Sequence, residues 1–440
     1  MPIHPRHPAS IRSKQPFSKI HPPRPGATSL CLAACAALLG TPVGHAVEYR
    51  LDGDVSVGQQ YSSNIILSRP PKAVWGTNVD VNAALAVSEP NWQVTGKARL
   101  SNYFYTPVSG IDMQNQYLDV RGLFLTERSR YQLSGNFTDD SFLSSQNDQI
   151  IGLVVGKVHR NLKSLSPTWF YTLSERSQWS LGYQYSRAEY DASANGFPDS
   201  DTHTGFSRLE HRFSERLSLS GEVSYSAYDA RRLATGYRNS IDFVNFSLGL
   251  KYAFDPTLDI EFSAGGQYSR TEAQFLHNQI VGFTLVSLNP IRFAPVVRAV
   301  IVHTPPADSF GPVFNLEVSK RLDRTEMSLF YNRQISPSIS GDLLEVDRAG
   351  LSAKRELFYG FSGSLGVSYT HQSFPSQANQ TISFSFYQAT GELSYAWSEH
   401  WSATASYRFF LRQIDNSNAP NEDSNSVLLT LKYNFDTHAF

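Results

Sequence analysis

Residues 170–185 read FYTLSERSQWSLGYQY, where two runs of alternating apolar and polar residues flank the polar turn Ser174-Glu175-Arg176. Successive side chains on a β-strand point to opposite faces, so a strand with one apolar face shows a period of two. Similar phrases recur as LTERSRYQLSG from Leu125 and as FSERLSLSGEVSY from Phe213. This recurrence predicts an antiparallel hairpin as the repeating unit of the chain.

The alternation continues over most of residues 47–440. The apolar positions are odd from Tyr49 to Val57, even from Trp92 to Phe104, and odd again from Trp401 to Leu411. A content of 22 Tyr and 28 Phe with only 3 Met also favours strands over helices. Beyond residue 46 no apolar run reaches the length of about 18 residues that a membrane-spanning helix needs. If the chain crosses a membrane, we expect it to cross as strands.

The connections between the expected strands alternate between short and long. We expect tight turns at 89–91, 127–128, 175–176, 215–216, 255–256, 323–324, 357–358 and 398–400. We expect long polar loops at about 62–74, 105–115, 139–158, 187–202, 229–242, 271–311, 335–344, 372–381 and 412–425. The pattern predicts an all-β fold: a single transmembrane antiparallel up-and-down barrel of about 18 strands (16–18), with both termini on the tight-turn side.

Two details qualify this interpretation. Residues 293–303 also alternate in part, and we assign them to the long loop, as a small hairpin with residues 275–286. A β-propeller is the alternative at a repeat of about 40 to 45 residues, but it needs four short strands per blade. Here each interval holds two strands of about 10 to 13 residues, the length of a tilted membrane strand.

The first 46 residues resemble an export signal. They hold five of the 38 Lys and Arg and no acidic residue, so 33 basic residues face 39 acidic ones in the rest of the chain. This acidic balance argues against nucleic acid as a partner. The apolar run LCLAACAALLG and the small residues before Val47 predict a signal peptide, 1–46, cleaved after Ala46. A lipoprotein signal with Leu32-Ala33-Ala34-Cys35 as its lipobox is the alternative. Both cysteines lie in this segment, so the exported chain would be cysteine-free.

Aromatic residues gather at the expected strand ends. Trp92, Trp179, Trp397 and Trp401 lie near tight turns, where we predict an aromatic girdle at the periplasmic interface. The terminal strand SVLLTLKYNF and the last residue resemble the signal read by the barrel assembly machinery, with Tyr433, Phe435 and Phe440 as its aromatic residues.

Charged side chains fall on the opposite parity from the aromatic ones, which suits a wet lumen and a lipid-facing exterior. We therefore predict that the pore is lined by Lys97, Arg99, Asp119, Arg121, Arg208, Glu210, Arg212, Glu222, Lys251, Glu261 and Glu317. Charges of both signs across a pore select solutes by size and polarity. The apolar stretch 150–156, IIGLVVG, has no clear role in this scheme.

Several phrases resemble the β-barrel porin family found beside exopolysaccharide and PEP-CTERM sorting systems in Gram-negative bacteria. They are YSSNIILS (61–68), RNLKSLSPTWFYTLSERSQWSLGYQYS (160–186) and SLFYNRQISPSISGDLLEVDRAGLSAKREL (328–357). The resemblance covers nearly all of residues 47–440. It implies an outer-membrane barrel that acts as a porin or an accessory of polysaccharide export, with outer-membrane lipid and periplasmic export components as partners.

Catalytic and metal motifs are not apparent. The chain lacks an HExxH, CxxC or G-x-S-x-G motif, so we expect no enzyme activity and no cofactor or metal. His203 and His211 share one face of an expected strand, which we interpret as a lumen or loop mouth. Three functions stay open: a porin-like channel for hydrophilic solutes or saccharides, a non-conducting component of a polysaccharide export system, and a lipid or glycan hydrolase of the outer membrane.

Overall fold

The computed structural model describes residues 47–143, 157–191, 197–232, 236–288, 291–374, 382–415 and 420–439. They belong to one compact unit, Val47–Phe440. The predicted signal peptide, the apolar stretch 150–156 and Phe440 lie outside the described residues. Among the described residues, no helix is long and apolar enough to cross a membrane.

Every regular element in the described ranges is a strand. The first half of the chain forms β1 (Glu48–Ser62), β2 (Val74–Glu89), β3 (Trp92–Thr106), β4 (Met113–Leu125), β5 (Ser129–Leu143), β6 (Lys157–Ser174), β7 (Ser177–Tyr190), β8 (Asp199–Arg212), β9 (Leu217–Arg232) and β10 (Tyr237–Asp255). The second half forms β11 (Leu258–Leu288), β12 (Ile291–His303), β13 (Ala307–Leu322), β14 (Thr325–Pro337), β15 (Leu343–Phe358), β16 (Phe361–Phe374), β17 (Ile382–Ala396), β18 (Trp401–Ile414), β19 (Glu422–Asn434) and the short β20 (His438–Ala439).

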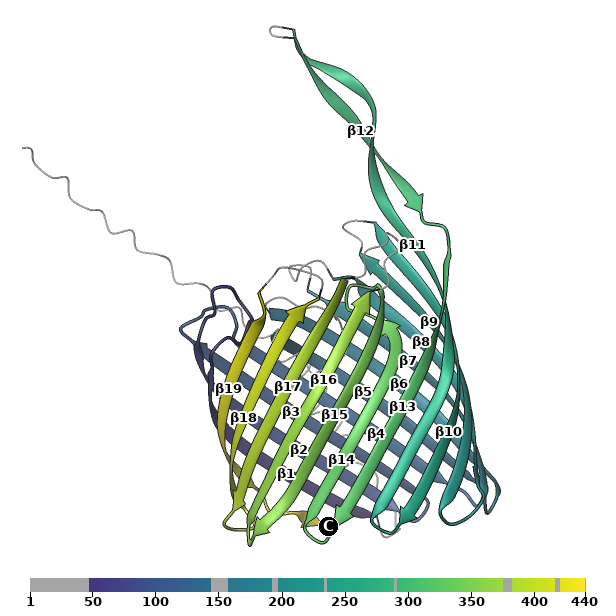
Figure 1. Cartoon of the computed structure of the whole chain (residues 1–440), viewed down its shortest axis with the longest axis vertical. Helices are drawn as coiled ribbons and strands as arrows, with labels where there is room; N and C mark the ends of the chain where they lie inside the picture. Colours follow the sequence, from purple (N-terminus) through teal and green to yellow (C-terminus); the bar gives the residue numbers. More distant parts are fainter. Residues whose placement is uncertain are drawn as a thin grey trace, which may run out of the picture. The chain divides into compact units, whose positions relative to one another are not determined.

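The strands form a closed antiparallel barrel. Each strand from β1 to β11 pairs with the next, β11 pairs with β13, and the series continues to β19, which pairs back onto β1. The ring therefore has 18 strands, as the alternation of turns and loops predicts. Figure 1 shows the tilted strands of the near and far walls. Closure leaves no free edge in the ring.

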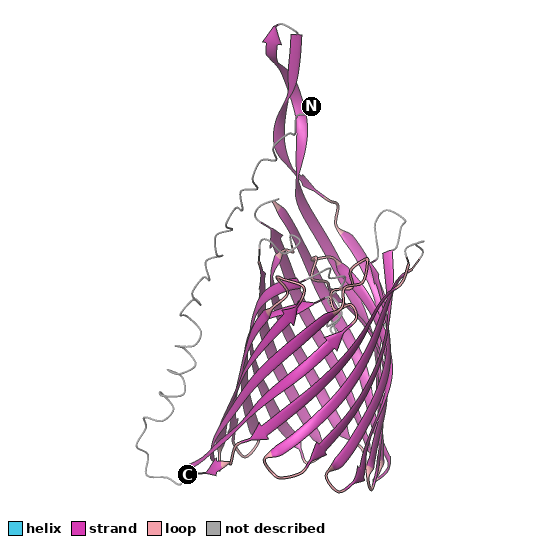
Figure 2. Cartoon of the chain, turned by 90° about the vertical axis from the view of Figure 1, so that its left-hand side faces the viewer, coloured by secondary structure: helices cyan, strands magenta, loops and turns pink. Residues whose placement is uncertain are grey.

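One hairpin extends beyond the ring. The first part of β11 pairs with β13, and its second part, from Gln274 to Leu288, pairs with β12. The predicted hairpin between 275–286 and 293–303 is thus confirmed. Figures 1 and 2 show this hairpin projecting from the barrel at the edge where the long loops lie. We call this edge the long-loop edge and the opposite one the tight-turn edge.

The tight turns lie within two residues of where the sequence places them, and the turn expected at 255–256 is at Pro256 and Thr257. The turn expected at 357–358 lies two residues later, at Tyr359 and Gly360. Gly360 has a φ of +75°, a conformation that L side chains rarely adopt, and an added Cβ would lie 2.5 Å from the Ala396 carbonyl oxygen. The turn therefore forms at the glycine, which adopts a positive φ without steric cost.

The long loops are shorter than predicted. The segments expected as loops at 187–202 and 229–242 are largely strand, because β7 runs to Tyr190, β8 begins at Asp199, β9 runs to Arg232 and β10 begins at Tyr237. Their outward side chains are polar, so the apolar period ends there while the backbone ladder continues. The prediction ended each strand at its last outward apolar residue, whereas the strand itself continues further.

The two faces of the wall differ in polarity. The outer face carries exposed apolar side chains in alternate positions, such as Leu209, Val223, Leu248 and Leu365. The intervening positions form the inner face and are mostly polar. The buried apolar clusters lie among the loops and strand ends at the long-loop edge.

Candidate functional site

The predicted pore-lining residues alternate with the apolar outward ones, and eight of the eleven line two hollows of the inner wall. Lys97, Arg99 and Asp119 share the first hollow with Asp52 and Asp54 of β1. Asn136 Nδ2 donates a hydrogen bond of 2.6 Å to Asp119, and the Arg99 guanidinium lies 4.0 Å from the centre of the Tyr117 ring.

The second hollow lies on β8–β11 and contains Arg208, Glu210, Glu222, Lys251 and Glu261. Arg208 lies 3.7 Å from Glu210 and 3.9 Å from Glu222. Strand register places Glu261 beside Lys251 on one side and beside Glu317 on the other, so one cation is followed by two adjacent carboxylates.

The remaining three predicted residues line neither hollow: Arg121, Arg212, and Glu317, which lies in register beside Glu261. Arg121 donates a hydrogen bond of 2.6 Å to Gln132 on the next strand. Arg212 pairs in register with Ser218 near the tight-turn edge. The pore-lining role of all eleven residues stays a prediction.

A loop within the predicted stretch 335–344 crosses the long-loop mouth. Residues 338–342 connect β14 to β15, yet Asn239 Nδ2 of β10 donates a 2.6 Å hydrogen bond to the Gly341 carbonyl oxygen. Ile339 is 5% exposed and packs against Val158 of β6. The loop therefore contacts walls of the barrel several strands away, and Figure 2 shows loop segments between the walls at this level.

Gly341 is the point of closest approach. It has a φ of +89°, and an added Cβ would lie 3.1 Å from the Ala230 Cβ and 3.2 Å from both Pro198 and the Tyr237 hydroxyl. Within the loop, the Ser338 amide donates to the Asp342 carbonyl at 2.8 Å, and the Gly341 amide donates to the Ser338 carbonyl at 3.0 Å. These contacts fix a compact loop against the inner wall.

A second set of loops packs at the same mouth. Ile65 of the loop 63–73 and Ile111 of the loop 107–112 are buried in one apolar cluster with the strand ends of β2–β5. Arg69 from the first loop lies 2.9 Å from Glu422, which also pairs with Arg412 on the inner face of β18. Buried charges need such partners, so these contacts tie the loop to the wall.

A further buried ion pair lies at this mouth. The Arg160 guanidinium of β6 donates hydrogen bonds of 3.1 and 2.9 Å to the Asp140 carboxylate of β5. Both side chains are about one-tenth exposed. The bidentate geometry fixes both groups, because each of the two carboxylate oxygens accepts from a rigid fork.

The four predicted girdle tryptophans lie at the tight-turn edge. Trp92 begins β3 and donates a 2.9 Å hydrogen bond from Nε1 to Glu89. Trp179 lies 5.5 Å from Trp169, and Trp397 stacks 6.2 Å from Trp401, measured between ring centres. Their contact with a membrane interface stays a prediction.

The predicted assembly residues that the structure describes adjoin this girdle. Tyr433 lies 4.9 Å from Trp401 and 5.3 Å from Phe435, again between ring centres. The Phe435 amide donates to the Gly53 carbonyl oxygen of β1 at 2.9 Å. Recognition by the assembly machinery stays a prediction.

The interpretation of His203 and His211 as residues of the lumen or of a loop mouth was wrong. His203 and His211 share parity with Leu209 and so lie on the outer face. Tyr183 and Ser177 hold them through contacts of 2.6 and 2.8 Å. Within the described ranges, no group of three His, Cys, Asp or Glu residues could hold a metal ion.

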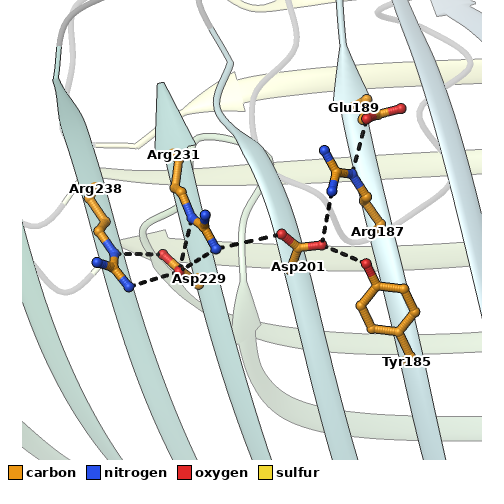
Figure 3. A network of polar contacts seen from close by, with 7 residues as sticks. All are labelled: Tyr185, Arg187, Glu189, Asp201, Asp229, Arg231 and Arg238. Atoms are coloured by element: carbon orange, nitrogen blue, oxygen red, sulfur yellow. Dashed lines mark hydrogen bonds and ion pairs between the residues drawn. The ribbon is translucent and has the colours of Figure 1, made fainter. Parts of the chain in front are cut away.

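A network of charges was also missed, because all of its charged residues lie in segments expected to be loops. It consists of Tyr185, Arg187, Glu189, Asp201, Asp229, Arg231 and Arg238, and Figure 3 shows these side chains projecting from β7–β10. We call it the outer arginine network. All of these residues have the parity of the outward apolar side chains. The available signal was charged residues at alternate positions of one strand, as in Arg187 and Glu189.

The closed ring, with an apolar outer face and a polar inner face, defines the protein as a transmembrane β-barrel. No family model matches the chain, and no curated protein matches it in sequence. Among solved structures it is similar to the open form of the ferric-catecholate import receptor Fiu from E. coli K12, with 9% identity and a TM-score of 0.46, covering 87% of this chain and 82% of that chain.

Two other solved structures are similar in the same way. OccAB4 from Acinetobacter baumannii has 11% identity and a TM-score of 0.43, with 90% of this chain and 99% of that chain covered. The copper transporter OprC has 8% identity and a TM-score of 0.41, with 88% and 83% covered. At these identities the likeness is one of fold alone.

Proposed function

We propose that the protein is a porin-like channel for hydrophilic solutes in the outer membrane of a Gram-negative bacterium. A barrel of this strand number is wide enough to hold an aqueous lumen. The observation that carries the proposal is the loop 338–342, which reaches inside the ring and is fixed there through Asn239 and Ile339. A loop fixed inside a wide lumen narrows it, and a narrowed polar lumen selects solutes.

Saccharides are the solute class that we favour. The inner wall presents aromatic faces beside arginines, with Arg99 over Tyr117 and Arg348 5.4 Å from the centre of the Phe330 ring. Aromatic faces and charged hydrogen-bonding groups together suit the apolar faces and hydroxyls of sugars. The proposed link to exopolysaccharide export, with periplasmic export components as partners, is supported by the sequence resemblance.

We place both ends of the barrel chain in the periplasm. Glu48 at the start of β1 is in register with Ser88 next to a tight turn, and His438 of β20 pairs with Leu51. Both ends therefore lie at the tight-turn edge, which faces the periplasm in barrels of this class.

A non-conducting role in a polysaccharide export system is the second candidate. The hairpin of β11 and β12 favours it, because β12 pairs with no described strand other than β11 and the hairpin extends beyond the ring. Such a hairpin offers unpaired strand edges to another protein on the side of the membrane away from the periplasm.

Conductance separates the two candidates. The folded barrel is added to a planar bilayer, and folding is checked by heat-modifiable migration on a gel. We expect stepwise current, and faster swelling of proteoliposomes in small neutral sugars than in large ones. A correctly folded barrel that gives no stepwise current in any salt would contradict the channel and favour the assembly role.

A further inference from the structure

The outer arginine network lies where the apolar surface ends. On the outer face of β9 the apolar positions run from Leu217 to Ala227, and the next two outward residues are Asp229 and Arg231. A tilted strand crosses the hydrocarbon layer in about 9 to 11 residues. The network therefore begins at the level where a membrane changes from acyl chains to polar headgroups.

Tyrosines mark this border on several strands. The Tyr185 hydroxyl donates to Asp201 at 2.8 Å, Tyr225 donates to Asp242 at 2.8 Å, and Tyr331 donates to Asp347 at 2.7 Å. Each ring belongs to the outward parity, and each hydroxyl bonds to a carboxylate on the next strand. Amphipathic rings of this kind are typical of a membrane interface.

The carboxylates of the network hold its arginines in place. Arg238 donates from Nε and Nη2 to Asp229 at 3.1 and 3.0 Å, and Arg231 Nη2 lies 2.9 Å from Asp229 and 3.8 Å from Asp201. Arg187 Nε donates to Glu189 at 3.0 Å, and its Nη1 lies 3.9 Å from Asp201. Figure 3 shows that the contacts link four neighbouring strands.

The cations nevertheless form the outer surface. The side chains of Arg187, Arg231 and Arg238 are 45%, 54% and 53% exposed, whereas those of Asp201 and Asp229 are 21% and 20% exposed. Lys163, which pairs with Glu189, adds a fourth exposed cation. A guanidinium has five N–H donors, so the bonds to carboxylates leave donors on these exposed side chains for a further acceptor.

We propose that the outer arginine network binds the phosphate groups of a phosphorylated lipid headgroup in the leaflet at the long-loop edge. Guanidinium forks match phosphate oxygens in bidentate geometry, and the carboxylates beneath them fix the forks before the lipid binds. The apolar face directly below would accept the acyl chains of the same lipid. Stabilisation of the barrel alone is a weaker explanation, because exposed ion pairs contribute little to stability.

The test measures lipid binding by native mass spectrometry of the full barrel in detergent. The probes are diphosphorylated lipid A, the same lipid with its phosphates removed, and inorganic phosphate. We expect the wild-type barrel to retain the diphosphorylated lipid, and the variant R187Q/R231Q/R238Q to bind it on the order of a hundredfold more weakly. Neither the wild type nor the variant should retain the phosphate-free lipid. Inorganic phosphate at the same concentration as the diphosphorylated lipid should not displace that lipid from the wild type.

The matched control removes the same charge from the tight-turn edge. Arg216, Arg324 and Arg355 are exposed there, and R216Q/R324Q/R355Q should bind the lipid as the wild type does. Equal loss in both triple variants would show a general charge effect and overturn the proposal, as would equal retention of the phosphate-free lipid. Heat-modifiable migration verifies folding, and conductance is measured separately, so this result does not depend on the channel function.

Discussion

Replacing Gly341 by alanine should release the loop 338–342 from the inner wall. Gly341 has a φ of +89°, and an added Cβ would meet Ala230, Pro198 and Tyr237 at 3.1 to 3.2 Å. A non-glycine residue held in such a conformation costs about 1 to 3 kcal/mol. If the docked loop bears this cost and the undocked loop does not, the undocked fraction rises by a factor of about 5 to 150.

Cysteine labelling measures this fraction without requiring the channel to conduct. The reporter is I339C in a chain with C31S and C35S, because Ile339 is 5% exposed and those are the two natural cysteines. We expect G341A to speed maleimide labelling of the reporter by the same factor, with noisier single-channel current if the barrel conducts.

The control is Gly110→Ala in the same background. Gly110 has a φ of +84°, so it carries similar backbone strain, but an added Cβ there meets no atom within 4 Å. G110A should therefore leave the labelling rate at position 339 unchanged. If G341A and G110A give the same rate, the loop does not depend on the fit at Gly341 and the reasoning is refuted.

Three further predictions concern other parts of the barrel. Deleting residues 275–302 should leave heat-modifiable migration intact, because β12 adds no pair to the ring; loss of the folded band would contradict this. E261Q/E317Q should shift the reversal potential toward anion selectivity, since Lys251 keeps its charge while the adjacent Glu261 and, one strand further, Glu317 lose theirs; an unchanged potential would argue against a pore-lining role. Hydrogen bonds from Thr257 lower the pKa of Asp255 in its tight turn to about 2, from an ordinary value of 3.8. The ionised carboxylate therefore stabilises the fold, and this contribution to stability is full above pH 3.8 and is lost as the pH falls through 2. The D255N variant should lack this pH-dependent loss of stability when its acid unfolding is compared with that of the wild type.

The parts of the fold that the sequence predicted are those that alternate along the chain. The turn Ser174-Glu175-Arg176 between two alternating runs is the turn between β6 and β7, and the hairpin of 275–286 with 293–303 is present. The strand ends were missed because the prediction used hydrophobicity. Arg187 and Asp201 pair across β7 and β8, so the ladder continues beyond the last apolar residue.

The candidate site was predicted only in part. The charges that gather in the inner hollows share one parity, and parity is readable from the order of residues, as for Arg208 and Glu222. The mouth loop lies within the predicted loop 335–344, but its docking was not predicted, because nothing near Gly341 in the sequence indicates which wall it meets. Its partner Asn239 lies 102 positions away along the chain.

By itself, the sequence determined the hairpin unit, the number of strands in the ring and the polarity of the two faces. These follow from a period of two residues, which each strand carries within its own few residues. Only the tertiary structure decided where the loop 338–342 docks and how Arg187, Arg231 and Arg238 come together on the outside. Both arrangements need the ring to close first, because closure alone brings side chains from separate strands within bonding distance.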